Sequence, residues 1–147
     1  MIGIDTNILF YALNPKSKYF PKAKEFVEAV MSGGEHQVVM TDYVLVELYN
    51  LLRNPAVMDA PLSSKRATQV VTSYLKSPIV TRAESAPIMD KVWKITEGEG
   101  FARRRIFDVR LALTLQHHGV TQFMTANVKD FQDLGFDKVC NPIIEAW

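Results

Sequence analysis

The sequence predicts an α/β fold in which a parallel sheet is covered by helices on both faces. Short apolar runs of strand length alternate along the chain with stretches whose apolar residues recur at helical spacing. The first run is the N-terminus itself, residues 1–9, which begins apolar and is broken at Asp5 by a carboxylate followed by Thr-Asn. We interpret it as a buried strand that ends on Asp5. With 147 residues and no linker or low-complexity tract, we expect one domain, residues 1–147.

Strand and helix signals then follow in order. An apolar segment at 8–13, stopped by Asn-Pro, leads into a helix whose first position is a proline. We expect further strands at 37–40, 78–81, 122–125 and 138–140, and helices at 21–31, 42–53, 64–75, from 85–87 onward, and at 106–118. In the helix that starts near 85, the side chains of Ile88, Val92 and Ile95 are expected to face the core.

Composition and charge exclude several classes of protein. Hydrophobic residues make up 48% of the chain and charged residues 22%, which is ordinary for a globular domain. The net charge is only +1, so affinity for a nucleic acid has to come from local clusters of Lys and Arg. The single Cys140 excludes a disulfide framework and fits a reducing compartment. With no membrane span or signal peptide visible, we expect a cytoplasmic protein without a membrane partner.

Two acids stand at positions that suit either chemistry or ordinary local structure. Asp5 follows a strand at the edge where open α/β sheets bind ligands, but it could equally cap the turn or helix that comes next. Glu47 lies at the margin of the apolar stripe of the helix 42–53. A carboxylate there can turn toward the core or remain a solvated flank residue.

A third acid, Asp108, shares a helix face with apolar residues. Leu111, Ala112 and Leu115 follow it at three, four and seven places, which is the spacing of one face. Burying a carboxylate costs several kcal/mol unless donors or a cation satisfy it, and free N–H groups at a helix N-terminus offer such donors. A helix cap and a metal ligand are therefore both open, and the two roles are compatible.

The fourth acid, Asp130, lies just past the strand 122–125, with Asn127 between them. Taken singly it is explained by turn chemistry. Together, four carboxylates with no His or Cys among them form a donor set that suits Mg²⁺ or Mn²⁺. Such a cation polarises phosphate and lowers the pKa of bound water, which favours phosphodiester hydrolysis as the reaction class.

These residues also resemble a known family. The order Ile-Gly-Ile-Asp-Thr-Asn, Val-Glu-Leu, Ile-Phe-Asp and Thr-Ala-Asn-Val-Lys-Asp-Phe is similar to that of the PIN-domain nucleases, and in particular of the VapC-type toxins of type II toxin–antitoxin pairs. Residues 1–13, 41–54 and 104–131 carry this resemblance. It implies a three-layer sandwich with a central five-stranded parallel sheet, and a Mg²⁺- or Mn²⁺-dependent endoribonuclease inhibited by a cognate antitoxin protein. We also expect a homodimer.

Carried over by motif, the four catalytic and metal-binding acids are Asp5, Glu47, Asp108 and Asp130. We expect Asp5 and Asp108 to bind the principal cation directly, with Glu47 and Asp130 as outer or second-metal ligands. Many relatives have Asp where Asn127 stands, so whether Asn127 or Asp130 completes the site is left open.

The expected contacts to the RNA substrate come from polar and basic neighbours of these acids. Thr6 and Asn7 are expected to orient Asp5 or the scissile phosphate, and Asn127 to hold a water or a phosphate. Arg103, Arg104 and Arg105 are candidates for backbone phosphates, although a run of three arginines is also typical of a solvated loop.

Other functions fit the residues less well. A phosphoaspartyl phosphatase needs a second acid two places after the first, where this chain has Asn7, and a response-regulator receiver needs an adjacent acidic pair that is absent here. A PIN fold that binds RNA or protein without cutting is the alternative. The filled set of four acids argues against it.

Overall fold

The computed structural model describes residues 1–34 and 36–147 and forms a three-layer α/β sandwich. The strands are β1 (Ile2–Ile4), β2 (Val38–Thr41), β3 (Val80–Ala83), β4 (Gln122–Met124) and β5 (Lys138–Cys140). They form one sheet in the order β3-β2-β1-β4-β5, and every neighbouring pair is parallel. The predicted five-stranded parallel sheet is therefore confirmed, with β1 at its centre.

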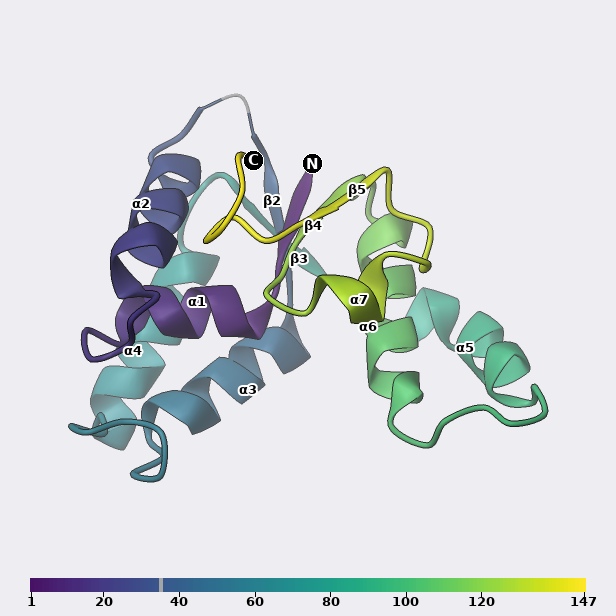
Figure 1. Ribbon diagram of the computed structural model, residues 1–147, viewed down its shortest axis with the longest axis horizontal. Coiled ribbons are helices and arrows are strands. Elements are labelled where there is room, and N and C mark those ends of the chain that lie inside the picture. The colour runs from purple at the N-terminus through teal and green to yellow at the C-terminus, as the bar shows by residue number, and fades with distance from the viewer. Residues whose placement is uncertain (35) are drawn as a thin grey trace.

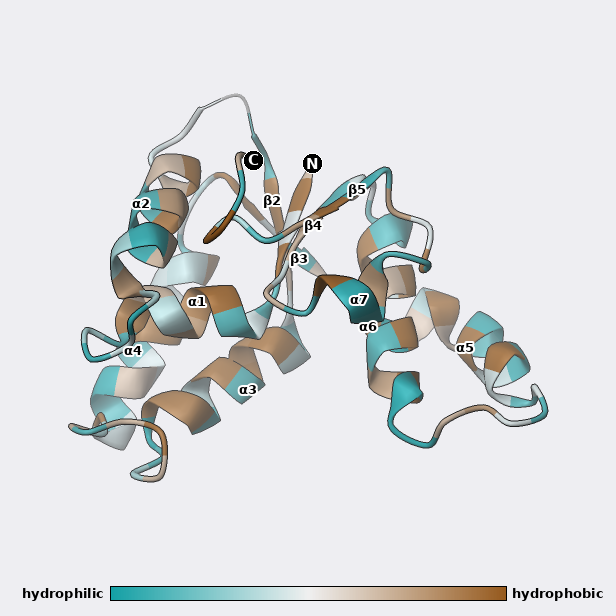
Figure 2. Cartoon of the chain, in the orientation of Figure 1, coloured by the Kyte–Doolittle hydropathy of each residue, from teal (hydrophilic) through white to brown (hydrophobic). Residues whose placement is uncertain are grey.

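Helices cover both faces of this sheet. They are α1 (Thr6–Leu13), α2 (Phe20–Met31), α3 (Asp42–Leu52), α4 (Ser64–Leu75), the 3₁₀ turn η1 (Ala86–Ile88), α5 (Met89–Thr96), α6 (Arg105–His117) and α7 (Val128–Phe131). Figure 1 shows α1 to α4 on one side of the sheet and α5 to α7 on the other. The central strands β1, β2 and β4 are mostly hydrophobic (Figure 2), as expected where a sheet is buried on both faces, whereas the edge strands β3 and β5 carry exposed polar residues.

Side chains of the central strand pack against both layers. Ile2 and Ile4 are 1% and 2% exposed, and Gly3 lies between them. A Cβ atom on Gly3 would come within 2.9 Å of Leu115 Cδ1 on α6 and 3.1 Å of Phe123 Cδ2 on β4. Glycine at this position therefore allows α6 to lie close against the sheet, directly below the end of β1.

Local signals account for the helix boundaries. The Ser63 hydroxyl accepts a hydrogen bond from Arg66 N and begins α4, and the Thr41 hydroxyl accepts one from Val44 N and begins α3. In the described part of the chain, no helix is long and apolar enough to reach across a bilayer.

Two sequence predictions on local structure need correction. The third strand runs from Val80 to Ala83 instead of 78–81, because its register is fixed by pairing with β2, Val38 opposite Val80. Ile95 is 43% exposed, because it lies in the last turn of α5, outside the small apolar cluster that Ile88 and Val92 make with α6.

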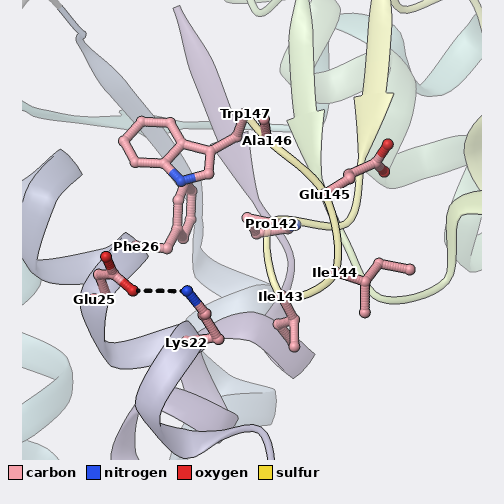
Figure 3. Close-up of a pocket in the computed structure, with 9 residues that line it drawn as sticks. All are labelled: Lys22, Glu25, Phe26, Pro142, Ile143, Ile144, Glu145, Ala146 and Trp147. Atoms are coloured by element: carbon pink, nitrogen blue, oxygen red, sulfur yellow. Dashed lines mark hydrogen bonds and ion pairs between the residues drawn. The ribbon is translucent and has the colours of Figure 1, made fainter.

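The C-terminal segment packs back against α2. The ring of Trp147 meets that of Phe26 edge-on, with centroids 4.8 Å apart. Figure 3 shows the cavity of about 400 Å³ between this segment and α2. None of the four acids predicted to carry the chemistry lines it.

Candidate active site

The four predicted acids line one cleft at the carboxyl edge of the sheet. Asp5, Glu47, Asp108 and Asp130 are all among the residues that surround a cavity of about 890 Å³. Asp5 follows the central strand, Glu47 comes from α3, Asp108 from α6 and Asp130 from α7. In Figure 1 these elements surround the end of β1, with α1 and α3 on one side and α6 and α7 on the other. The sheet topology thus brings together residues up to 125 positions apart in the sequence.

Asp5 is the buried acid of the cleft, with 9% of its surface exposed. Its Oδ1 accepts a hydrogen bond from Thr6 N at 2.8 Å. Its Oδ2 accepts one from the Asn7 side-chain amide at 2.9 Å and one from Thr125 Oγ1 at 2.6 Å. Asp5 is also the N-cap residue of α1, so the capping role and the position in the cleft coexist.

The surroundings of Asp5 raise its pKa to about 6 from the ordinary value of 3.8. Burial is the largest cause, because the protein interior solvates the charged form poorly. The negative charge of Glu47 raises the pKa further, whereas the hydrogen bonds from Thr125, Thr6 and Asn7 lower it. The Asp5 carboxyl therefore takes up a proton near pH 6, closer to neutral pH than an ordinary aspartate does.

Glu47 is solvent-exposed but tied to the same network. Its Oε2 accepts a hydrogen bond from Thr6 Oγ1 at 2.9 Å. Thr6 therefore donates its hydroxyl to Glu47 and its backbone N–H to Asp5, which fixes the two carboxylates relative to each other. Glu47 is exposed, as expected for a solvated flank residue, but that alternative did not include the hydrogen bond from Thr6.

Asp108 lies in the first turn of α6 and is less buried than its spacing predicted. Its side chain is 32% exposed, while Leu111, Ala112 and Leu115 on the same helix are buried. The N-cap of α6 is Arg104, so Asp108 is not the capping residue. Burial raises the pKa of Asp108, the nearby Arg105 guanidinium lowers it, and the charge of Asp130 raises it.

Asn127 and Asp130 both face the cleft. Asp130 is exposed on the short helix α7, and Asn127 directly precedes that helix. The backbone N–H of Asn127 donates to Thr125 Oγ1 at 3.0 Å, which ties this turn to the buried Asp5. The arrangement therefore offers both the amide and the carboxylate to a ligand.

The three consecutive arginines separate into three environments. Arg104 lines the cleft, whereas Arg103 is exposed and is not among the residues that surround it. Arg105 donates to the Asp130 carbonyl oxygen and lies 3.5 Å from Asp108 Oδ2, so its guanidinium holds α7 against α6. Of the three, Arg104 is the one whose position suits a substrate phosphate.

Comparison with known proteins identifies the family. The model of the PIN domain family matches residues 2–137. The chain is also 43% identical over 143 residues to Ribonuclease VapC24 of Mycobacterium tuberculosis, and the match covers 97% of each chain. This chain belongs to the PIN-domain family. The resemblance seen in the sequence to VapC-type proteins is thereby confirmed.

Solved structures share the fold of this PIN domain. The Mycobacterium tuberculosis VapC20 toxin, described as cleaving the sarcin–ricin loop, matches with a TM-score of 0.66 at 16% identity, over 92% of this chain and 96% of that one. FitAB bound to a DNA fragment matches with a TM-score of 0.63 at 18% identity, over 100% and 99% of the two chains. At these identities the likeness concerns the fold.

The donor set of this PIN domain suits a divalent cation in its chemistry, since it consists of carboxylate oxygens. The negative charge of Glu47 raises the pKa of Asp5, and that of Asp130 raises the pKa of Asp108, and a cation between the acids of each pair would relieve that repulsion. Among residues 1–34 and 36–147, no group of three Asp, Glu, His or Cys side chains lies close enough together to hold a metal ion. The exposed carboxylates of Glu47 and Asp130 would therefore have to turn inward to share one.

Three residues of the cleft network were not predicted from the sequence. Thr125 is fully buried and holds Asp5, and Tyr43 and Arg110 line the cleft. The position of Thr125 was accessible to reasoning, since it directly follows the strand that pairs with β1. The pairing of Tyr43 with Arg110 depends on the approach of α3 to α6, and no local pattern indicates it.

Proposed function

We propose that this chain is a Mg²⁺- or Mn²⁺-dependent endoribonuclease that acts as the toxin of a toxin–antitoxin pair. One observation carries the proposal: in a PIN-domain chain that is 43% identical to a ribonuclease, the four acids Asp5, Glu47, Asp108 and Asp130 surround one cleft. Four oxygen-donor side chains with no His or Cys among them suit a hard cation.

In this proposal Asp5 and Asp108 hold the principal cation, and Glu47 and Asp130 complete the site from its rim. When bound, the cation polarises the phosphodiester and lowers the pKa of water in its coordination sphere. Thr125 and Asn7 hold the Asp5 carboxylate in place through hydrogen bonds, and Arg104 faces the cleft as a counter-charge for phosphate. A water oxygen bonds to phosphorus while the P–O3′ bond breaks, giving a 5′-phosphate and a 3′-hydroxyl.

An antitoxin protein is the second partner in the proposal. Four carboxylates in one cleft attract a basic side chain, and such a side chain would compete with the cation for the same oxygens. We place the protein in the cytoplasm, together with its RNA substrate. Co-purification with the product of the neighbouring gene tests the partner, and undiminished RNA cleavage by the complex would show that inhibition does not occur at the site.

We also infer that the chain forms a homodimer. Apolar side chains lie exposed at a groove between α3 and α4, where Val46 is 67% exposed and Leu75 is 37% exposed. Sedimentation of the wild type and of Val46→Asp tests this association. A monomeric wild type at micromolar concentration would exclude the dimer.

The competing function is a PIN fold that binds RNA without cutting it. Mixed RNA incubated with and without Mn²⁺ separates the two, with melting temperatures measured on the same samples. The nuclease proposal predicts cleavage that depends on Mn²⁺ and a higher melting temperature when Mn²⁺ is bound. Binding of RNA without cleavage under any of these conditions would favour the silent module.

A further inference from the structure

Arg110 and Tyr43 form a stacked pair between two elements of the cleft. The guanidinium carbon of Arg110 on α6 lies 4.0 Å from the ring centroid of Tyr43, which stands in the first turn of α3. The Tyr43 hydroxyl also donates to the Arg110 backbone carbonyl oxygen at 3.4 Å. Both residues line the cleft, and Arg110 is two positions from Asp108.

The charge of Arg110 is not neutralised by the acids around it. Over the described residues, 1–34 and 36–147, the ion pairs are Lys22–Glu25, Lys24–Glu28, Arg82–Asp42 and Arg105–Asp108. Arg110 belongs to none of them. Its Nε is buried and is the one buried side-chain polar atom in that part of the chain without a hydrogen-bond partner. Buried donors are nearly always paired in folded proteins, so the unpaired Nε indicates that the surrounding protein groups do not satisfy the Arg110 guanidinium on that side.

Stacking explains how the guanidinium stays in an acidic cleft without pairing with a carboxylate. The face of the guanidinium plane rests on the aromatic ring, which leaves the terminal N–H groups free at the edge of that plane, whereas Nε is buried. These N–H groups form the fork that binds two oxygens of a phosphate or a carboxylate at once. The cleft is lined by four carboxylates and by two guanidinium groups, those of Arg104 and Arg110. With all six groups ionised, one divalent cation would bring the net charge of the cleft lining to zero. A polyanion could then approach.

We propose that Arg110, presented by Tyr43, binds a backbone phosphate of the RNA in the cleft. This inference rests on the proposed ribonuclease function. Tyr43 is a positioning residue, since it acts by holding the guanidinium plane. We favour an RNA phosphate over a carboxylate of a partner protein as the ligand of Arg110. The cleft already carries four acids, which repel any further anion, and the substrate of the proposed reaction is the anion that has to enter the cleft.

The chain contains a matched control. The guanidinium carbon of Arg53 lies 5.5 Å from the ring centroid of Tyr49, and neither residue lines the cleft. Tyr49 belongs to α3, and Arg53 is the C-cap residue of that helix. Arg53→Gln therefore removes the same charge from the same kind of arginine–tyrosine pair outside the site. Tyr43→Phe keeps the ring that carries Arg110, and Tyr43→Leu removes it.

The test measures binding of a labelled single-stranded RNA in Ca²⁺, a divalent cation that balances the fixed charge of the cleft, across a range of KCl concentrations, and then cleavage in Mn²⁺. For Arg110→Gln we expect the Kd to rise at least tenfold and the slope of log K against log[salt] to lose about 0.7, the value for one phosphate contact on a single strand. In cleavage, KM should rise more than kcat falls. Arg53→Gln should resemble the wild type. Tyr43→Leu, which removes the ring, should weaken binding more than Tyr43→Phe, which keeps it.

Arg110→Lys keeps the charge and the stem, and covers the case in which Arg110→Gln does not fold. It should retain the salt slope but raise the Kd several-fold, because an ammonium group cannot bind two oxygens as a fork. If the folded Arg110 variants bind RNA with the Kd of the wild type, and the wild type cleaves RNA, the inference is overturned and the proposed function stands. Loss of binding to the neighbouring gene product, with RNA binding intact, would assign Arg110 to a protein carboxylate and overturn it equally. A wild type that neither binds nor cleaves RNA would overturn both.

Discussion

Thr125→Val tests the reasoning about the buried acid most directly. Thr125 Oγ1 donates to Asp5 Oδ2 at 2.6 Å, and Thr125 is fully buried. A hydrogen bond to a charged group contributes about 1.5–3 kcal/mol, and one pKa unit corresponds to about 1.4 kcal/mol. Valine keeps the shape and removes the donor. We therefore expect the pKa of Asp5, about 6 in the wild type, to rise by about one to two further units.

The sign of the pH dependence follows from the direction of this shift. The folded protein holds the Asp5 proton more tightly than the unfolded chain, since the pKa is raised from 3.8 to about 6. The stabilisation that comes with protonated Asp5 is fully present below about pH 4 and is lost as the pH rises through 6. Integrated over that window, it amounts to about 3 kcal/mol of unfolding free energy for the metal-free protein. In Thr125→Val the loss should continue to about pH 7 or 8.

The assay uses the rise in melting temperature that Mn²⁺ causes, measured between pH 5 and pH 8.5. A cation must displace the Asp5 proton, so its affinity falls about tenfold per pH unit below the pKa of Asp5. The wild type should show a midpoint near pH 6. Thr125→Ser, which keeps the hydroxyl, should match it, and Thr125→Val should have a midpoint one to two units higher. Identical midpoints in Val, Ser and wild type would refute the role of this hydrogen bond.

Three further changes give distinct outcomes. Glu47→Gln removes a charge that raises the pKa of Asp5, so the midpoint of the Mn²⁺ response should move below pH 6, and a midpoint at higher pH would contradict the electrostatic account. Asp108→Asn removes the repulsion with Asp130, so the metal-free melting temperature should hold or rise while cleavage of a labelled RNA falls by orders of magnitude; an active, metal-responsive variant would show that Asp108 is no ligand. Gly3→Ala brings a Cβ to 2.9 Å from Leu115 Cδ1, so denaturant unfolding should show a loss of about 1–3 kcal/mol with the pH midpoint unchanged, and an unaltered stability would mean that α6 shifts freely.

The sequence predicted those parts of the fold whose signals are local. The helix at 64–75 has the predicted ends, and the structure adds that the Ser63 hydroxyl caps its start. The third strand was placed two residues early, because an apolar run does not say where pairing with the next strand begins. Ile95 was assigned to the core from its spacing alone, although the core contacts of α5 lie nearer the start of that helix.

The residues that line the cleft were predicted as far as each could be read from its own segment. Asp5 follows a strand and Asp108 follows an arginine run, so both positions were visible in the sequence. Their burial was not: Asp5 is the buried carboxylate and Asp108 is partly exposed. Thr125 and Arg110 gained their contacts from chain segments 120 and 67 positions away, and such contacts have no local signature.

The position of the cleft follows from the strand order. From β1 the chain adds β2 and then β3 on one side, and later returns to place β4 and β5 on the other side of β1. Ligands of open α/β sheets bind at such a reversal, beyond the carboxyl ends of the strands. Asp5 ends the central strand there, so it is buried between the neighbouring connections, whereas Glu47 and Asp130 come from helices at the rim and remain exposed. Changes at Asp5 should therefore alter stability and activity together, and changes at Glu47 or Asp130 should alter activity with little effect on folding.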